Sequence, residues 1–341
     1  MKVLLKRRLF LSSASMVAAS YLASGRSALA DEWQPSLRLP DPSIKILDPA
    51  FASCINTLST VHRIASGFEW AEGPVWMGEA NLLFFSDVRK NCIMKWDEAT
   101  SVTSVFRNAS NFANGNTVDR QGRLLTCENA TRRITRTELD GRITVIADGF
   151  DGKPFNSPND IVCASDGGVW FTDPTFGPNF AEGALTPTQP ARVYRIDPRT
   201  KETSVVLDDV PGPNGLCFSP NGKTFYVVAS RHAPRRQIWS YDVVKNTSLS
   251  NKRVFLDCGE GAADGIRADI NGNIWCGWGS GAGMDGVAIF NPQGTQIGHV
   301  DLPERCANLC FGGAQRNQLF MAARTSVYQL TLATQGIRQV D

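Results

Sequence analysis

The sequence predicts an all-β protein, a six-bladed β-propeller, and three observations support this fold class. Short runs rich in β-branched and aromatic residues follow one another after about residue 64, and Gly, Asn, Asp and Pro separate them. Segments with a helical period are hard to find in the same region. A motif made of one polar residue and an apolar hairpin recurs six times, at spacings typical of propeller blades.

The repeat unit is a polar residue, a short apolar strand, a turn and a second apolar strand, as in "PNDIVCASDGGVWFTD" and "PNGLCFSPNGKTFYVV". The polar residues that lead the six copies are Glu72, Asn116, Asn159, Asn214, Asp264 and Asn308. Successive leading residues are 44, 43, 55, 50 and 44 positions apart, close to the roughly 40–50 residues of a propeller blade. Further strands, such as "ARVYRID", follow the hairpins and are expected to complete four-stranded blades.

The chain divides into three regions. Residues 1–30 begin with basic residues, continue with an uncharged run and end in Ala-Leu-Ala, which is typical of a secretory signal peptide. The segment "KRRLFL" within it resembles a twin-arginine signal, so export of either the folded or the unfolded chain stays open. Residues 31–60, rich in Pro and Ser, are expected to form an extended leader, and residues 61–335 one propeller domain. We therefore expect a periplasmic or secreted protein.

Charge and hydropathy exclude two classes of partner. Five of the 35 basic residues lie in the predicted signal, which leaves 30 basic against 33 acidic residues and a net charge of −3. Without a basic stripe, binding to nucleic acid is not expected. Because no apolar stretch reaches the roughly 18 residues of a membrane helix, no membrane span is expected either.

The nine cysteines do not form an obvious disulfide framework. Their number is odd and no CxxC pair occurs, although an oxidising compartment would permit disulfides. Three of them, Cys163, Cys217 and Cys276, lie in strand-like runs where a free thiol packs as a small apolar group. Packing is the favoured interpretation, and pairing stays open.

The leading residues are candidates for a metal site, because the first strand of each propeller blade lines the central channel. Two carboxylates and four carboxamides would then meet there, and Ca²⁺ takes about 6–8 oxygen ligands of this kind. None of the three histidines leads a repeat, which argues against a histidine-rich zinc site. Asn and Asp also mark ordinary turns. Glu72, however, has no role in a turn and would be costly to bury unpaired.

Four motifs, in this order, resemble the senescence-marker-protein/gluconolactonase family: "EWAEGPVW", "NSPNDIV", "GPNGLCFSP" and "ADGIRADINGNIWCG". The resemblance covers most of residues 60–325. It implies a six-bladed propeller that hydrolyses a sugar lactone, such as glucono-1,5-lactone, with the help of calcium. It also implies that Glu72, Asn214 and Asp264 bind the metal, with Asn159 as a fourth ligand.

Lactone hydrolysis requires a polarised carbonyl group, a water molecule and a stabilised oxyanion. A bound cation can polarise the carbonyl and carry the developing charge, and we expect Asp264 to assist the water as general base. Residues expected to contact the sugar are Asn116, Asp160, Arg267, Arg231 and His232, the last two in the insert "SRHAPRRQ". Salt bridges within the blade are an equal alternative for Asp160 and Arg267. The long segment "TFGPNFAEGALTPTQPA" is a further candidate for covering the channel.

Several alternatives stay open for the function. The oxygen ligands also suit Zn²⁺, Mg²⁺ or Mn²⁺. A calcium-dependent organophosphate hydrolase, or another ester hydrolase, could use the same site. A non-catalytic periplasmic propeller that binds a ligand is the third possibility. A serine hydrolase is disfavoured, because the sequence contains no GxSxG motif.

Overall fold

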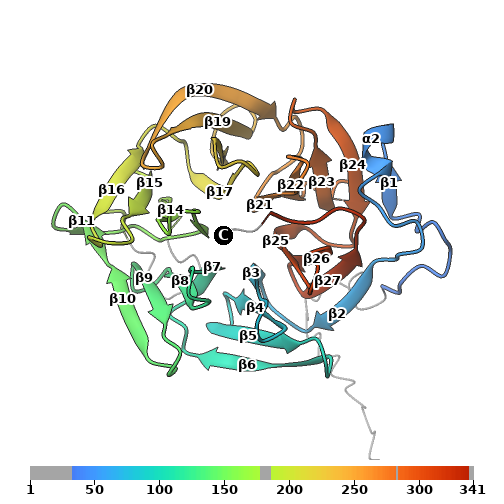
Figure 1. Cartoon of the computed structure of the whole chain (residues 1–341), viewed down its shortest axis with the longest axis horizontal. Helices are drawn as coiled ribbons and strands as arrows, with labels where there is room; N and C mark the ends of the chain where they lie inside the picture. Colours follow the sequence, from blue (N-terminus) through green and yellow to red (C-terminus); the bar gives the residue numbers. More distant parts are fainter. Residues whose placement is uncertain (1–32, 177–185, 282, 338–341) are drawn as a thin grey trace, which may run out of the picture.

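The chain forms a six-bladed β-propeller, as the repeat predicted (Figure 1). The structure is a computed structural model that describes residues 33–176, 186–281 and 283–337. The predicted signal peptide and part of the long blade-three segment lie outside the described residues. Over the described ranges, six antiparallel sheets surround a central axis, with the first strand of each blade nearest the centre.

Blades one to four each consist of four consecutive strands, which follow one another from the axis outward. Blade one contains β3 (Ala71–Met77), β4 (Leu82–Asp87), β5 (Cys92–Asp97) and β6 (Val102–Asn108). Blade two contains β7 (Ala113–Val118), β8 (Leu124–Glu128), β9 (Arg133–Thr137) and β10 (Ile143–Ala147). Blade three contains β13 (Ile161–Cys163), β14 (Val169–Asp173), β15 (Arg192–Ile196) and β16 (Thr203–Leu207). Blade four contains β17 (Pro213–Phe218), β18 (Thr224–Ala229), β19 (Gln237–Val244) and β20 (Ser248–Asp257).

Blades five and six take strands from both ends of the chain. Blade five contains β21 (Ile266–Ala268), β22 (Ile274–Trp278), β23 (Gly286–Phe290) and β24 (Gln296–Asp301), and β1 (Ile44–Ile46) adds a fifth strand at its rim. Blade six contains β25 (Cys306–Gly312), β26 (Gln318–Ala323) and β27 (Ser326–Thr331). Its outer strand is β2 (His62–Ser66), which pairs antiparallel with β27 and so closes the ring.

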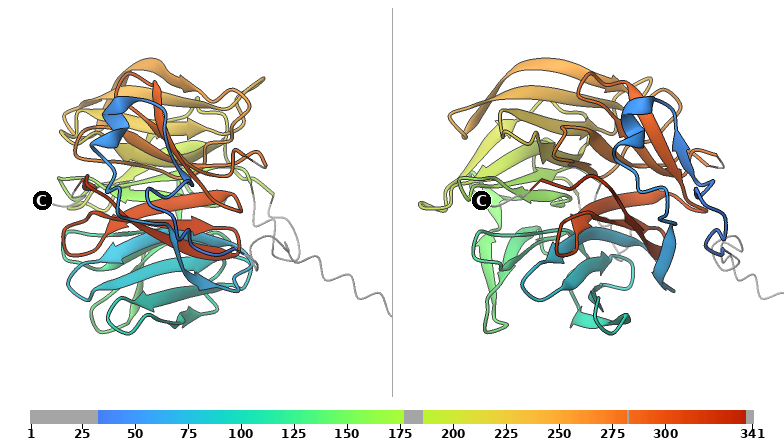
Figure 2. Two further views of the ribbon diagram at one scale, coloured as in Figure 1. Left: turned by 90° about the vertical axis from the view of Figure 1, so that its right-hand side faces the viewer. Right: turned by 45° about the vertical axis from the view of Figure 1, so that its right-hand side comes forward.

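Two small elements lie outside the blades. The hairpin of β11 (Gly149–Phe150) and β12 (Lys153–Pro154) connects blades two and three. The short helix α2 (Pro49–Ala52) packs beside β1 and β24 on the outside of the disc (Figure 2). It begins after Asp48, whose carboxylate accepts a hydrogen bond from the Ala50 amide and so caps the helix.

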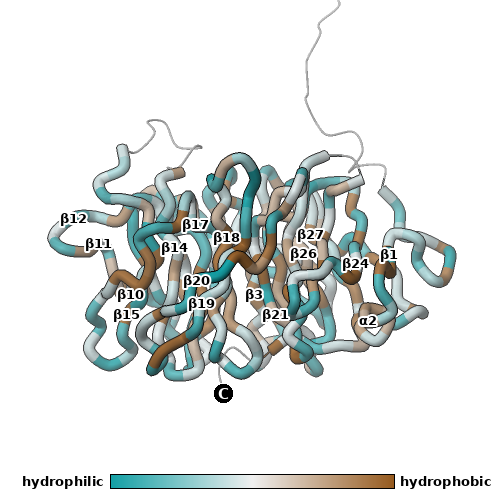
Figure 3. Tube along the Cα trace, turned by 90° about the horizontal axis from the view of Figure 1, so that it is seen from above, coloured by the Kyte–Doolittle hydropathy of each residue, from teal (hydrophilic) through white to brown (hydrophobic). Residues whose placement is uncertain are grey.

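The hydrophobic core lies between the blades. Alternate residues of a strand point to opposite faces, and in this ring both faces are covered by a neighbouring blade. In β4, for example, Leu83 and Phe85 pack toward blade six, whereas Phe84 packs toward blade two. Among the described residues, each of the six interfaces between blades has its own buried apolar cluster. The edge view in Figure 3 places the connecting turns at the two flat faces of the disc.

All nine cysteines are buried and none forms a disulfide in the structure. Burial raises the pKa of thiols such as Cys163 and Cys217 to about 12, so they remain protonated at neutral pH. Cys163, Cys217 and Cys276 therefore pack as small apolar groups, as the sequence favoured. The described part of the chain contains no helix with the length and hydropathy of a membrane span.

Candidate active site

The start of each inner strand has a common geometry that brings residues of different blades to one end of the channel. Ala71, Ala113 and Pro213 each pair with the last residue of the second strand in their blade. In all three blades the pairing register then shifts, as in a β-bulge. Bulges of this kind reorient the side chains beside them. The residues that follow, at the leading position of their blades, are Glu72, Asn114 and Asn214.

The same leading position can be identified in the other blades from backbone hydrogen bonds. Glu72 pairs with the penultimate residue of β4. The amide of Asn159 likewise donates to the penultimate residue of β14, and that of Asp264 to the penultimate residue of β22. In blade six the penultimate residue of β26 pairs with Asn308. The amide of Gly265 nevertheless donates to the carbonyl of Ala307, as the amide of Gly115 donates to that of Asn159, which places Ala307 in the equivalent position. The repeat in the sequence thus assigned four of the six positions, Glu72, Asn159, Asn214 and Asp264, whereas blade two places Asn114, and not Asn116, in the equivalent place.

Glycines explain why these motifs read "EGP" and "NGL". A Cβ atom on Gly73 would lie 2.1 Å from the carbonyl oxygen of Asn114, and one on Gly215 would lie 2.1 Å from that of Asp264. Both distances are far below van der Waals contact, so any side chain would force adjacent inner strands apart. The glycine after each polar residue therefore allows the blades to approach closely at the site.

Two carboxylates lie close together at this end of the channel. Glu72 and Asp264 are 4% and 7% exposed. Burial raises the pKa of Glu72 to about 8, and the nearby carboxylates of Asp264 and Asp160 add to the rise. The amide of Gly73 donates to the Glu72 carboxylate and opposes it. Repulsion between buried carboxylates shows that this part of the channel would be stabilised by a positive charge.

Arginine side chains supply part of that positive charge. Burial raises the pKa of Asp264, whereas the guanidinium groups of Arg305 and Arg236 lower it. Arg305 forms an ion pair with Asp264, with Nη2 and Oδ2 2.5 Å apart. Arg236 donates from Nη1 to the carbonyl oxygen of Ala263 at 3.0 Å. Sequence reasoning missed both arginines. The available signal was the position of Arg305 directly before the inner strand of blade six.

The donor atoms fit a hard divalent cation. The buried Oδ1 atom of Asn159 has no hydrogen-bond partner among the described residues, although such atoms are normally satisfied. Asn214 lies within hydrogen-bond reach of Asp264, where it lowers the pKa of that carboxyl. The described chain has no group of three or more His, Cys, Asp or Glu side chains arranged for a metal. The candidate donors are therefore two carboxylates supplemented by amide oxygens, a combination suited to Ca²⁺.

Asp160 and Arg267 are brought together as a buried ion pair. Arg267 Nη1 lies 3.1 Å from Asp160 Oδ2, and its Nη2 lies 3.3 Å from Oδ1. Arg267 also donates to the carbonyl oxygen of Ile266 at 2.7 Å. Both side chains are almost fully buried, and they link blades three and five across the channel. The two residues thus form a salt bridge in this structure, but it joins two blades, whereas the alternative drawn from the sequence placed such bridges within one blade.

Asn116 is also fully engaged within the protein. Its Nδ2 donates to the carbonyl oxygen of Gly73 and to Ser86 Oγ, both at 2.9 Å, and its Oδ1 accepts from Thr126 Oγ1 at 2.8 Å. These bonds join blades one and two. The adjacent leading residue Asn114 is partly exposed, so it is the blade-two side chain better placed to meet a substrate.

Arg231 and His232 lie in the connection between β18 and β19, which is at the same end of the channel as the leading residues. The Arg231 guanidinium lies 4.7 Å from the centre of the Phe176 ring and donates to Thr175 Oγ1 at 3.3 Å. It therefore links the blade-four insert to the start of the long blade-three segment. His232 packs against Trp239 of its own blade instead. Within this connection it is Arg236 whose positive charge lowers the pKa of Asp264.

The chain is similar to known proteins over most of its length. A family model described as "SMP-30/Gluconolactonase/LRE-like region" matches residues 70–325. The chain is 30% identical over 313 residues to the gluconolactonase of Zymomonas mobilis. The aligned region covers 84% of this chain and 85% of that protein. It is 26% identical over 275 residues to the pentonolactonase of Haloferax volcanii. That alignment covers 77% of this chain and 84% of the pentonolactonase.

A solved structure agrees with the sequence comparison. The gluconolactonase of Xanthomonas campestris superposes with a TM-score of 0.78 at 30% identity. The superposition covers 88% of this chain and 99% of that one. Together with the family match over three quarters of the chain, these likenesses confirm the resemblance inferred from the four sequence motifs. The chain therefore belongs to the SMP-30/gluconolactonase/LRE-like family.

Proposed function

We propose that the chain opens a sugar 1,5-lactone, such as glucono-1,5-lactone, to the aldonic acid at the mouth of the channel lined by Glu72 and Asp264. It is a lactonase, as the relatives named gluconolactonase and lactonohydrolase indicate. The assignment to this site rests on the buried pair of carboxylates and on the amide oxygen of Asn159, which occupies the same leading position in its own blade and lacks a partner among the described residues.

A divalent cation, Ca²⁺ in the first place, would be held by Glu72, Asn159, Asn214 and Asp264. When bound, it supplies positive charge that polarises the lactone carbonyl and stabilises negative charge on its oxygen. The unpartnered Asn159 oxygen and the mutual repulsion of the two carboxylates support this donor set. Zn²⁺, Mg²⁺ and Mn²⁺ remain alternatives with the same oxygen donors.

The residues of the chain would move one proton and position the reacting groups. Asp264 accepts a proton from the water that attacks the carbonyl carbon. The bond between that carbon and the ring oxygen then breaks, and the proton passes to the ring oxygen, which becomes a hydroxyl group. Arg305 and Arg236, both close to Asp264, are suited to bind the carboxylate that the reaction produces, since guanidinium groups pair well with carboxylates.

The experiment is hydrolysis of glucono-1,5-lactone, followed by acid release with added Ca²⁺ and with a chelator. We expect Glu72→Gln and Asp264→Asn to lose most of the cation-dependent rate. Glu79→Gln, a change at an exposed position in the turn after β3, should retain it. Full activity of both site variants would refute the assignment. A fluorophosphate assayed in parallel separates a lactonase from an organophosphate hydrolase, and a binding propeller would hydrolyse neither.

We propose further that the protein works in the periplasm or outside the cell after removal of residues 1–30. The basic, apolar and Ala-Leu-Ala segments of the sequence support this location. Fractionation of cells that express the full chain tests it, together with N-terminal sequencing of the exported protein. Retention of intact chain in the cytoplasm would contradict the proposal.

A further inference from the structure

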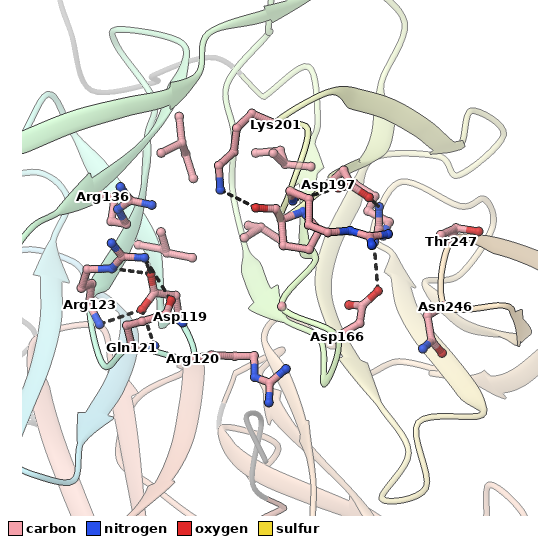
Figure 4. A pocket seen from close by; sticks show the side chains of 18 of the residues that line it. Asp119, Arg120, Gln121, Arg123, Arg136, Asp166, Asp197, Lys201, Asn246 and Thr247 are labelled. Atoms are coloured by element: carbon pink, nitrogen blue, oxygen red, sulfur yellow. Dashed lines mark hydrogen bonds and ion pairs between the residues drawn. The ribbon is translucent and has the colours of Figure 1, made fainter.

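A cavity distinct from the candidate active site lies between blades two and three. Its volume is about 670 Å³, within the roughly 300–1,000 Å³ typical of small-molecule pockets. Turns of three blades form its wall. They are the β7–β8 turn of blade two, the β13–β14 and β15–β16 turns of blade three and the β19–β20 turn of blade four. Figure 4 shows the polar side chains that surround it. We call it the basic cavity.

The basic cavity opens on the face of the disc opposite the candidate active site. The leading residues stand at the start of each inner strand, whereas the β7–β8 and β13–β14 turns follow the end of such a strand. The six residues of the inner strand β7 span roughly 20 Å, so the disc separates the two sites. Changes in the basic cavity therefore need not affect residues at the active site.

The lining of the cavity carries a large excess of positive charge. Seven arginines and lysines line it, against three aspartates. All three aspartates are already paired: Asp119 lies 2.7 Å from Arg123, and Asp166 and Asp197 lie 2.9 and 3.1 Å from Arg195. These pairs neutralise two of the arginines and hold them in place, Arg195 being only 4% exposed.

Four of the remaining cations have no ion-pair partner among the residues that the structure describes: Arg120, Arg199, Lys201 and Lys245. Arg120 extends from the blade-two turn, and Figure 4 marks no hydrogen bond or ion pair between it and the other residues drawn. Over the described ranges, the ammonium group of Lys201 donates to the backbone oxygen of Pro198, at 2.6 Å, and to no side chain. Cations that converge on a concave surface repel one another and concentrate anions there.

From these observations we infer that the basic cavity binds a phosphate group, either as the free ion or as the monoester of a molecule about the size of a sugar. Planar guanidinium groups donate paired hydrogen bonds to phosphate oxygens, and lysines add point charge. The cavity volume leaves room for an organic group beside the phosphate. No residue proposed for lactone hydrolysis lines the cavity, so this site is independent of that reaction.

Calorimetric titration of the purified protein, in buffer free of phosphate, tests the proposal. The probes are inorganic phosphate, glucose 6-phosphate and, as a carboxylate of similar charge, succinate. We expect saturable binding of a phosphate probe at one site per chain, and weaker binding of succinate. Comparison of the two phosphate probes distinguishes the free ion from an ester. No saturable binding of either phosphate probe, or equal binding of succinate, would overturn the inference.

Variants locate the binding. The double variant R120Q/K201Q should weaken phosphate binding about tenfold or more, because two charged donors are lost. The control R142Q/K223Q removes the same charge from exposed positions outside the cavity and should change the affinity less than about twofold. Equal weakening by both would mean a general charge effect and refute the site. Lactone hydrolysis at the wild-type rate verifies folding, and the single variant K245Q, in an exposed turn, provides a milder test.

Discussion

Replacing Glu72 by Gln should change how the stability of the cation-free protein depends on pH. Gln keeps the shape of the protonated glutamic acid but cannot ionise. The pKa of Glu72 in the folded chain is about 8, whereas the ordinary value for this carboxyl is 4.5. Between these values the unfolded state releases a proton that the folded state retains. The free energy of unfolding of the wild type therefore falls as the pH rises through this window.

The size of the effect follows from the two pKa values. One pKa unit corresponds to about 1.4 kcal/mol. Between pH 5 and pH 8 the wild type should therefore lose on the order of 3–4 kcal/mol relative to E72Q. At pH 5 the two proteins should differ by about 1 kcal/mol or less. Groups far from Glu72 titrate equally in both proteins, so the difference between them reports on Glu72 and on the carboxylate of Asp264 that interacts with it.

Denaturant unfolding in the presence of a chelator, at several pH values from 5 to 8, measures the difference. The control E79Q, at an exposed glutamate, should follow the wild type at every pH. Addition of Ca²⁺ at pH 8 should stabilise the wild type and leave E72Q nearly unchanged, since binding to the folded state raises its stability. A constant difference between wild type and E72Q across the whole range would refute the electrostatic reasoning.

Three further predictions concern packing, charge and thiols. Gly215→Ala should destabilise the fold by about 1–3 kcal/mol in denaturant unfolding, because the added Cβ would overlap the Asp264 carbonyl. The control Gly78→Ala should be close to neutral, because its Cβ would lie no nearer than 3.9 Å to Trp76. Arg305→Ala should lower kcat for glucono-1,5-lactone about tenfold to hundredfold, with Arg305→Lys intermediate; an unchanged kcat would exclude a role for the guanidinium. A thiol reagent should label fewer than one cysteine in the native protein and all nine after unfolding without reductant, whereas a smaller final count would reveal disulfides.

The sequence was sufficient to predict the blades because each one repeats the same local pattern. Polar residue, apolar strand, turn and apolar strand recur with little variation, and both faces of these strands are buried between neighbours. The repeat located Glu72, Asn159, Asn214 and Asp264 for the same reason. It placed the blade-two residue two positions too late, because the segment Ala113–Asn116 offers two asparagines. Only Asn114 is followed by a glycine, as Glu72, Asn214 and Asp264 are.

Other parts of the site lay beyond sequence reasoning. Arg236 and Arg305 belong to connections outside the repeated hairpin, so no internal comparison draws attention to them. Their effect on Asp264 depends on how the loops of blades four and six are directed, which tertiary packing decides. The ion pair of Asp160 with Arg267 joins residues 107 positions apart, and only the closed ring brings them together.

Closure of the ring by β2 and β27 has a consequence for how the molecule is made. The strand β2, which completes blade six, precedes its partner β27 by more than 250 residues. During translation it is therefore synthesised long before the strand with which it pairs. Until synthesis is nearly finished, the nascent ring stays open and the hydrogen-bonding edge of β2 has nothing to pair with. In a circular permutant that begins in the turn between β19 and β20, the pair of β2 and β27 would become local in sequence. The pair of β19 and β20 would then join the two ends of the chain, so the last contact to form should move from blade six to blade four.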